Sequence, residues 1–201
     1  MEIASIILAG GKGLRLGRSK AKEIIGGKTL IERVIRQLRK LSKYIYIATS
    51  REQSGLFKDM DAEVLVDIYP DSGPLGGIYT GLMSSPCQHN IVVACDMPFL
   101  NTDLLGYMVE LSRDFDAVVP RLSMEYVEPL HAVYSKACLD GIKSQLDEGR
   151  LQVILFLSKV RVRYIEREEC QRLDPNLLSF FNINYQPNLD WAIAMAAEKE
   201  T

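Results

Sequence analysis

The chain has 201 residues, of which 47% are hydrophobic and 25% are charged, and this is the composition of an ordinary folded protein. A formal net charge of −2 excludes a general electrostatic attraction to nucleic acid or to an anionic membrane. No apolar run approaches the roughly 20 residues of a membrane span, and the start of the chain does not have the pattern of a secretory signal. We therefore expect one domain over residues 1–201, acting in the cytoplasm on small molecules and not on nucleic acid or membranes.

Short β-branched runs alternate with amphipathic stretches in the first two thirds of the chain, which is typical of βαβ units around a parallel sheet. Strands are predicted over residues 3–9, 44–48, 63–66, 90–94 and 117–119. Helices are predicted over residues 30–41, from near Gly76, and from Asn101 or Thr102, where a polar side chain caps the first turn. These elements predict a Rossmann-like doubly wound α/β fold, with a mostly parallel sheet and helices on both faces.

Beyond residue 120 the pattern predicts mixed elements. A strand over 127–134 is interrupted by Pro129, and helices follow over 136–146 and 151–158. An edge strand is expected over 160–166, a short strand over 180–183, and a last helix over 188–198.

The first predicted strand runs into a glycine-rich loop that carries many cations. The loop begins at Gly10 and Gly11, and its cations are Lys12, Arg15, Arg18, Lys20 and Lys22. Ligands of open parallel sheets bind beyond the carboxyl ends of the strands, where glycines let backbone N–H groups approach an anion closely. The loop therefore predicts a nucleoside triphosphate site, and a flexible turn with solvated charges is the alternative.

Two other kinds of glycine loop do not fit. A Walker loop needs Ser or Thr after Gly-Lys, and Gly11-Lys12 is followed by Gly13. A dinucleotide fingerprint needs a third glycine and an acid after the second strand, where this chain has Thr49 and Ser50. The four cysteines form no CxxC pair, so a structural zinc site is not expected either.

Two further loops follow predicted strands. Asp96 comes directly after the strand over 90–94, and one well-placed carboxylate with a triphosphate suffices to hold magnesium, although a turn cap before Pro98 is an equal alternative. Asp67 opens a segment that continues through Gly73-Pro74-Leu75-Gly76-Gly77, a low-bulk loop against which a flat nucleobase could lie.

Together these three loops resemble the signatures of the molybdenum cofactor guanylyltransferases, within the larger group of sugar-phosphate and cofactor nucleotidyltransferases. The matching segments are Leu8-Ala9-Gly10-Gly11 with Arg15, Gly17 and Lys20; Gly73-Pro74-Leu75-Gly76-Gly77; Cys95-Asp96-Met97-Pro98-Phe99; Pro129-Leu130; and Asn182-Ile183-Asn184. The resemblance spans nearly the whole chain, and it implies the nucleotide-diphospho-sugar transferase-like form of the fold.

The resemblance also implies roles for individual residues. Nucleotide contacts fall to Leu8, Ala9, Gly10, Gly11, Lys20, Asp67, Gly73, Pro74, Leu75 and Asp96. Arg15, Lys20 and Asp96 are the expected catalytic residues, with Asp96 holding Mg²⁺. Asn182 and Asn184 are expected to face the cofactor substrate or the metal, and a helix cap is the alternative for that pair.

The expected reaction is transfer of GMP from GTP to the terminal phosphate of molybdopterin or the molybdenum cofactor, with release of pyrophosphate. Transient contact with cofactor-synthesis or acceptor enzymes is a further expectation. The alternatives are related chemistry with CTP or another phosphorylated acceptor, and a nucleotide-binding regulatory or carrier protein without catalysis. The chain departs from the family pattern at Glu128, where a histidine is common before Pro-Leu, so His131 does not simply inherit that role. Further departures are Ala48 at the end of the second strand and the segment Tyr185-Gln186-Pro187-Asn188.

Overall fold

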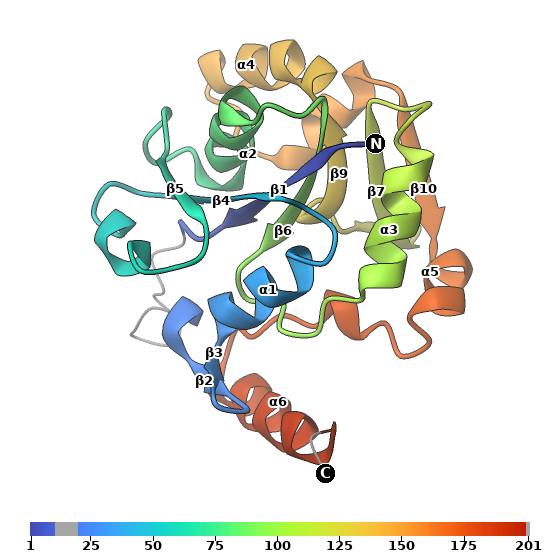
Figure 1. Ribbon diagram of the computed structural model, residues 1–201. Helices are drawn as coiled ribbons and strands as arrows, with labels where there is room; N and C mark the ends of the chain where they lie inside the picture. The colour runs from blue at the N-terminus through green and yellow to red at the C-terminus, as the bar shows by residue number, and fades with distance from the viewer. Residues whose placement is uncertain (11–19, 200–201) are drawn as a thin grey trace.

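One large sheet runs through the middle of the molecule, with helices on both of its faces (Figure 1). The computed structural model describes residues 1–10 and 20–199. The strands are β1 (Ile3–Leu8), β2 (Ile24–Ile25), β3 (Lys28–Thr29), β4 (Tyr44–Thr49), β5 (Glu63–Val66), β6 (His89–Ala94), β7 (Ala117–Ser123), β8 (Tyr126–Val127), β9 (His131–Ser135) and β10 (Val162–Glu166). The α-helices are α1 (Leu30–Leu38), α2 (Gly73–Ser84), α3 (Thr102–Leu111), α4 (Leu139–Asp147), α5 (Arg167–Leu173) and α6 (Gln186–Lys199). Short 3-10 helices are η1 (Lys20–Lys22), η2 (Ser54–Phe57), η3 (Lys136–Cys138), η4 (Val153–Lys159) and η5 (Leu178–Phe180).

The strands of the large sheet lie in the order β10-β7-β9-β6-β1-β4-β5, and β8 pairs with β7. Parallel pairing joins β1 to β4 and β6, β4 to β5, and β7 to β10. Strand β9 runs antiparallel between β6 and β7. The sheet is therefore mostly parallel, as predicted, with one reversed strand inserted near its middle.

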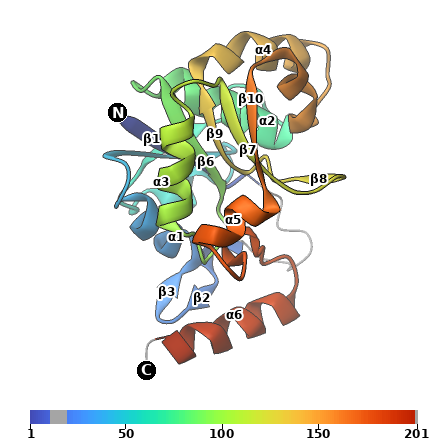
Figure 2. The same ribbon diagram turned by 90° about the vertical axis from the view of Figure 1, so that its right-hand side faces the viewer.

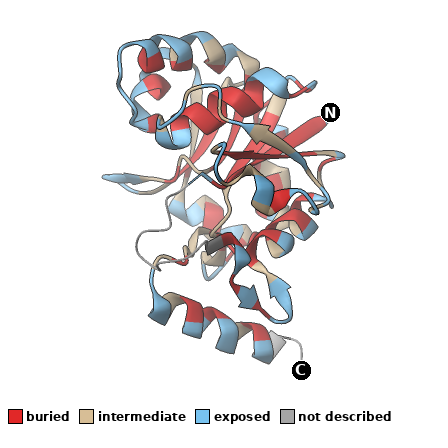
Figure 3. Ribbon diagram, turned by 90° about the vertical axis from the view of Figure 1, so that its left-hand side faces the viewer, coloured by how far each residue is buried: buried red, intermediate tan, exposed pale blue. Residues whose placement is uncertain are grey.

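Side chains of β1 alternate between two hydrophobic cores, because successive residues of a strand point to opposite faces. Ile3 and Ile7 pack with α1 and α3, whereas Ile6 and Leu8 pack with α2 and α4. Figure 2 shows α1 and α3 on one side of the sheet and α2 on the other, and Figure 3 shows the strands between them as buried. This two-sided burial explains why the sequence of β1 is apolar almost throughout.

Helix α2 lies unusually close to β1, and its glycines make that approach possible. A Cβ built on Gly81 would lie 2.6 Å from two atoms of Ile6, and one on Gly77 would lie 2.9 Å from Cδ2 of Leu8. A Cβ on Gly76 would lie 2.9 Å from the backbone oxygen of Tyr69. These glycines belong to the helix, which begins at Gly73. The expectation of a loop through Gly77 is therefore wrong, because close helix-to-strand packing uses these glycines.

Side-chain caps fix the starts of two other helices. Thr29 and Glu32 form a reciprocal capping box at α1, in which each side chain accepts from the other residue's backbone N–H. Asn101 accepts from the N–H groups of Asp103 and Leu104 at the start of α3, as the sequence indicated.

Two expectations for the last third of the chain are corrected. The predicted strand over 127–134 is two strands, because Pro129 lies in the turn between β8 and β9. The predicted strand over 180–183 is absent: η5 ends at Phe180, and the following residues are irregular. Phe181 instead packs its ring against Trp191 of α6, with 4.5 Å between centroids.

Two strands and one α-helix were not expected from the sequence: β2, β3 and α5. The hairpin of β2 and β3 packs on α6 through a small third core that includes Ile25, Ile183 and Leu189. Figures 1 and 2 place α6 beside this hairpin, at the opposite end of the molecule from α4. Within the described residues, no helix is long and apolar enough to cross a membrane.

Candidate active site

Four parallel strands end level with one another, so the segments that follow them meet at one edge of the sheet. Leu8 at the end of β1 pairs with Ala48 of β4 and Ala94 of β6, and Thr49 pairs with Val66 of β5. We call this the carboxyl edge, defined by Leu8, Thr49, Val66 and Ala94. The segments that open at Ala9, Ser50, Asp67 and Cys95 all leave from it.

Asp67 lies between the first loop and helix α2. Its Oδ2 is 3.6 Å from the Cβ position built on Gly10, and its Oδ1 is 3.6 Å from the one built on Gly77. Its backbone N–H donates to the oxygen of Thr49 at 2.9 Å. A Cβ at either position would be in ordinary van der Waals contact with this carboxylate, so both glycines lie directly beside it.

The carboxylate of Asp67 lacks a donor for one of its oxygens. Oδ1 is buried and has no hydrogen-bond partner among the described residues. Burial raises the pKa of Asp67 to about 6, because the charged form is poorly solvated there. A buried acceptor without a donor suits a hydroxyl or N–H group brought by a ligand. Oδ1 of Asp67 is therefore the acceptor at the carboxyl edge for which the nucleoside contact is predicted.

The side chains of Leu8 and Ala9 belong to the cores, since they are 8% and 5% exposed. Their backbone groups are also engaged. The N–H of Cys95 donates to the oxygen of Leu8 at 3.1 Å, and the hydroxyl of Thr49 donates to the oxygen of Ala9 at 3.1 Å. What this stretch presents at the carboxyl edge is the exposed Gly10.

Of the predicted base-contacting residues, some are exposed at the carboxyl edge and one belongs to the core. Gly73 and Pro74 are exposed at the start of α2, while the side chain of Leu75 is fully buried against the sheet. Gly73 has φ +58°, a backbone conformation that favours glycine. Ser72, the residue before the helix, makes no side-chain cap, so the first turn keeps backbone N–H groups available for another acceptor.

Asp96 is joined to the segment that holds Asn182 and Asn184. The N–H of Ile183 donates to the backbone oxygen of Asp96 at 3.0 Å, and the side chain of Ile183 is fully buried. The two asparagines on either side of it are half-buried. The side chain that accepts at the start of α6 is Asn188, from the N–H groups of Asn184 and Tyr185. The structure thus brings the predicted metal residue and the predicted acceptor residues together.

The donor set near Asp96 fits magnesium better than zinc. In residues 1–10 and 20–199 no three His, Cys, Asp or Glu side chains gather into a metal-binding group. Carboxylate and amide oxygens are present at Asp96, Asn182 and Asn184. Magnesium takes one or two carboxylates and completes its shell with phosphate oxygens and water.

Residues ahead of β9 form a part of this edge to which the sequence analysis gave no role. Glu128 is 5% exposed, and its Oε2 accepts from the hydroxyl of Tyr126 at 2.5 Å. His131 is fully buried, with no partner for either ring nitrogen in the described part of the chain. Burial lowers the pKa of His131 to about 4, and its ring packs on Phe180. His131 is therefore a core residue, and Glu128 is the polar group of this turn. The one signal of Glu128 in the sequence was its position directly before Pro129-Leu130.

Gly11 and Arg15 lie outside the described residues. Lys20 begins η1, and its side chain is not described. The phosphate contacts of these residues therefore stay predictions.

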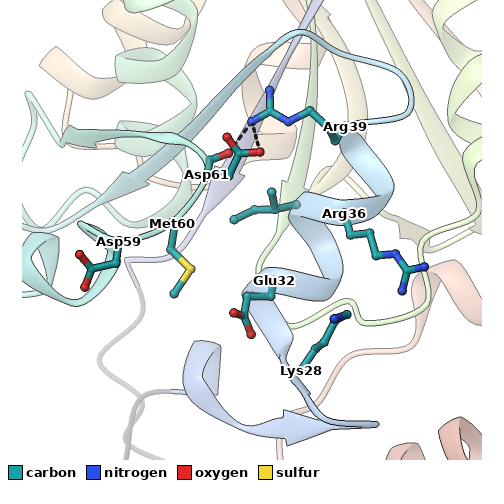
Figure 4. A pocket seen from close by; sticks show the side chains of 8 residues that line it. Lys28, Glu32, Arg36, Arg39, Asp59, Met60 and Asp61 are labelled. Carbon is teal, nitrogen blue, oxygen red and sulfur yellow. Dashed lines mark hydrogen bonds and ion pairs between the residues drawn. The ribbon is translucent and has the colours of Figure 1, made fainter.

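A cavity of about 480 Å³ lies elsewhere, between α1 and the segment after η2 (Figure 4). It is lined by Lys28, Glu32, Ile35, Arg36, Arg39, Asp59, Met60 and Asp61. Arg39 pairs with Asp61 across it at 2.9 Å, and Glu32 is bound to Thr29. None of the predicted site residues that the structure describes with their side chains lines this cavity. Acids and bases balance there, so the carboxyl edge is the better candidate for a triphosphate.

Comparison with known proteins agrees with this geometry. Residues 5–162 match the model of the MobA-like NTP transferase domain. A probable molybdenum cofactor guanylyltransferase of Pelotomaculum thermopropionicum is 35% identical over 100% of this chain and 97% of its own length. The crystal structure of molybdopterin-guanine dinucleotide biosynthesis protein A from Archaeoglobus fulgidus superposes with a TM-score of 0.85 at 27% identity, covering 97% of this chain and 99% of that one.

The fold extends to more distant enzymes. The 2-C-methyl-D-erythritol 4-phosphate cytidylyltransferase of Thermus thermophilus has a TM-score of 0.73 at 18% identity, covering 98% of this chain and 100% of that chain, and shares the architecture alone. The family model and the full-length relative reach further, because they include the loops at the carboxyl edge. On this ground the chain belongs to the MobA-like NTP transferase family.

Proposed function

We propose that this protein is a molybdenum cofactor guanylyltransferase, which transfers GMP from GTP to the terminal phosphate of molybdopterin or the molybdenum cofactor. The observation that carries the proposal is the meeting of Gly10, Asp67, Asp96 and the segment of Asn182 and Asn184 at one edge of the sheet, in a chain whose full-length relatives carry that name. We assign Asp67 to the nucleoside, Asp96 to the triphosphate with its metal, and the segment of Asn182 and Asn184 to the acceptor.

The reaction is an in-line attack by an oxygen of the acceptor's terminal phosphate on the α-phosphorus of GTP. A new P–O bond forms as the bond to the β-phosphate oxygen breaks, and pyrophosphate leaves with the electron pair. The attacking group is already an anion, so no base has to remove a proton from it. Repulsion between anions and the charge on the leaving pyrophosphate dominate the barrier.

Each group of residues has a part in lowering that barrier. Asp67 accepts a hydrogen bond from the nucleoside and fixes its orientation. Arg15 and Lys20 neutralise the phosphates, and Asn182 and Asn184 orient the acceptor. Mg²⁺, held by Asp96, would supply further neutralisation of the triphosphate and of the leaving pyrophosphate.

Several contacts must act together in this mechanism. Enzymes lower barriers by roughly 8 to 23 kcal/mol, whereas one charge-assisted hydrogen bond contributes about 1.5 to 3 kcal/mol. Alignment of the two bound reactants supplies a further large part, because it replaces an encounter in solution.

Incubation of the protein with GTP, magnesium and molybdopterin, followed by mass analysis of the pterin, tests the function. We expect a molybdopterin guanine dinucleotide and an equal amount of pyrophosphate. Asp96→Ala and Lys20→Ala should each lose most turnover while their thermal unfolding stays that of the parent, and Asp59→Ala on the exposed surface should keep both. Preference for CTP in a nucleotide panel would overturn the assignment of guanine. GTP binding without any product would favour a regulatory or carrier protein.

A further inference from the structure

Strand β9 begins beside the end of β6, and Glu128 lies in the turn just before β9. In the antiparallel ladder of β6 and β9, Val93 is the partner of His131. One step further, the N–H of Ala94 donates to the oxygen of Leu130 at 3.0 Å. Two residues beyond Ala94 along one segment is Asp96, and two residues before Leu130 along the other is Glu128. The chain turns between Glu128 and His131, whose N–H donates to the oxygen of Glu128 at 3.3 Å. This turn keeps Glu128 at the carboxyl edge, near enough to Asp96 for the negative charge of Asp96 to act on its carboxyl.

Glu128 is held firmly on its own side of this edge. Its backbone N–H donates to the oxygen of Pro120 in β7 at 2.9 Å. Oε2 accepts from the hydroxyl of Tyr126 at 2.5 Å, and Oε1 from the N–H of Leu130 at 3.3 Å. A carboxylate has about four acceptor positions, so these two bonds leave roughly half of them for another partner.

The charge of Glu128 lacks a protein counter-ion in the described part of the chain. Among the lysines and arginines whose side chains the structure describes, none forms an ion pair with it. Burial raises the pKa of this carboxyl, and the nearby negative charge of Asp96 raises it as well. A buried anion is costly unless it is paired or coordinates a metal, and two facing anions attract a cation.

We propose that Glu128 is a second carboxylate ligand of the divalent cation that Asp96 binds, and that Tyr126 holds the Glu128 side chain in position. This inference rests on the proposed function, because the cation comes with the bound triphosphate. Two carboxylates, phosphate oxygens and water make a set of ligands that magnesium accepts. Glu128 stands where histidine is common in the family, so this chain brings a full negative charge to the metal in place of a neutral ring.

Titration of the full-length protein with Mn²⁺ tests the inference without any turnover. Bound Mn²⁺ is measured by electron paramagnetic resonance in the presence of GTP and in the absence of an acceptor. Glu128→Gln keeps the size of the side chain and one of its two acceptor oxygens but removes its charge. We expect it to weaken Mn²⁺ binding by at least about 10-fold, as loss of a metal-orienting partner does. Asp96→Asn should weaken it by as much or more.

Matched variants separate a ligand from a structural residue. Glu125→Gln removes the same charge from an exposed position of the same hairpin and should leave Mn²⁺ affinity unchanged. Tyr126→Phe keeps the carboxylate and loses its anchor, so we expect an intermediate loss of Mn²⁺ affinity. If Glu128→Gln fails to fold, this variant alone decides, and unchanged Mn²⁺ affinity in it overturns the inference.

The result that overturns the inference is Mn²⁺ affinity in Glu128→Gln within about twofold of the parent while Asp96→Asn binds poorly. In that case the proposed function stands. A parent protein that binds no Mn²⁺ together with GTP would instead remove the proposed function itself, and the role of Glu128 with it.

Discussion

The ionised carboxylate of Asp67 should bind the nucleotide but lower the stability of the folded protein. Replacing it in Asp67→Asn should therefore raise the free energy of unfolding. The pKa of Asp67 is raised from 3.8 to about 6 by burial. A pKa shift of one unit corresponds to about 1.4 kcal/mol, so the ionised Asp67 lowers the free energy of unfolding by at most roughly 3 kcal/mol. Because the carboxyl is only partly buried, water screens its charge, and we expect about 1 to 2 kcal/mol at pH 7.

The sign follows from where the proton is bound. Between pH 4 and 6 the folded protein holds a proton on Asp67 that the unfolded chain releases, so the contribution of this residue to stability falls as pH rises through that window. Asparagine is neutral throughout. We therefore expect the free energy of unfolding of Asp67→Asn to exceed that of the parent by about 1 to 2 kcal/mol at pH 7, so that the variant unfolds at a higher urea concentration. This difference in free energy should disappear near pH 4.

Urea unfolding at both pH values measures this difference, and GTP binding is measured on the same samples. Asp67→Asn should bind GTP more weakly although it is more stable. Asp59→Asn is the matched control, because Asp59 is exposed and distant from the carboxyl edge, and it should change neither property. Equal stability of the parent and Asp67→Asn at pH 7 would refute the reasoning from burial, and unchanged GTP affinity would refute the nucleoside contact.

Two predictions concern the packing around the site. Gly81→Ala places a Cβ 2.6 Å from Ile6, so we expect overpacking to lower the free energy of unfolding by about 1 to 3 kcal/mol in urea, whereas Gly55→Ala, with open space around it, should be tolerated. Equal midpoints for the two variants would contradict close packing of α2. The buried His131, with its pKa lowered from 6.5 to about 4, favours the neutral ring, so stability is lost as pH falls through that range, by up to about 3 kcal/mol. His131→Leu should lack this loss when unfolding is followed from pH 7 to pH 4, and parallel curves for the two proteins would show that the ring is solvated.

The parallel part of the sheet was predictable because its signals are local. The strand over 63–66 is observed as β5 with the same bounds, and the edge strand predicted over 160–166 is confirmed as β10. Continuous apolar runs and caps such as Asn101 report directly on burial and on helix starts. That the segments of Asp67 and Asp96 leave from the same edge also followed from the fold, since parallel strands end at the same edge.

What the sequence did not reveal depends on contacts between distant segments. Gly77 was predicted to lie in a loop, yet it lies, like Gly81, in a helix whose distance from β1 only the folded chain defines. The segment around Ile183 has a strand-like composition, but in the described residues it forms no strand, and the N–H of Ile183 donates to the oxygen of Asp96, beyond the end of β6. The position of Glu128 at the carboxyl edge required the direction of β9, which no short motif encodes. The single-domain organisation, the cytoplasmic location and the phosphate contacts of the first loop stay predictions.

The direction of β9 widens the range of backbone that can supply the site. Strands that run one way can reach the carboxyl edge only through the residues that follow them, so each side chain there sits on a departing loop. The antiparallel strand β9 begins at the edge where its neighbour β6 ends. The residues that precede β9, including Glu128, therefore also lie at this edge. Changes in the β7–β8 hairpin can therefore alter the side chains at the carboxyl edge while the segments that leave from it keep their length.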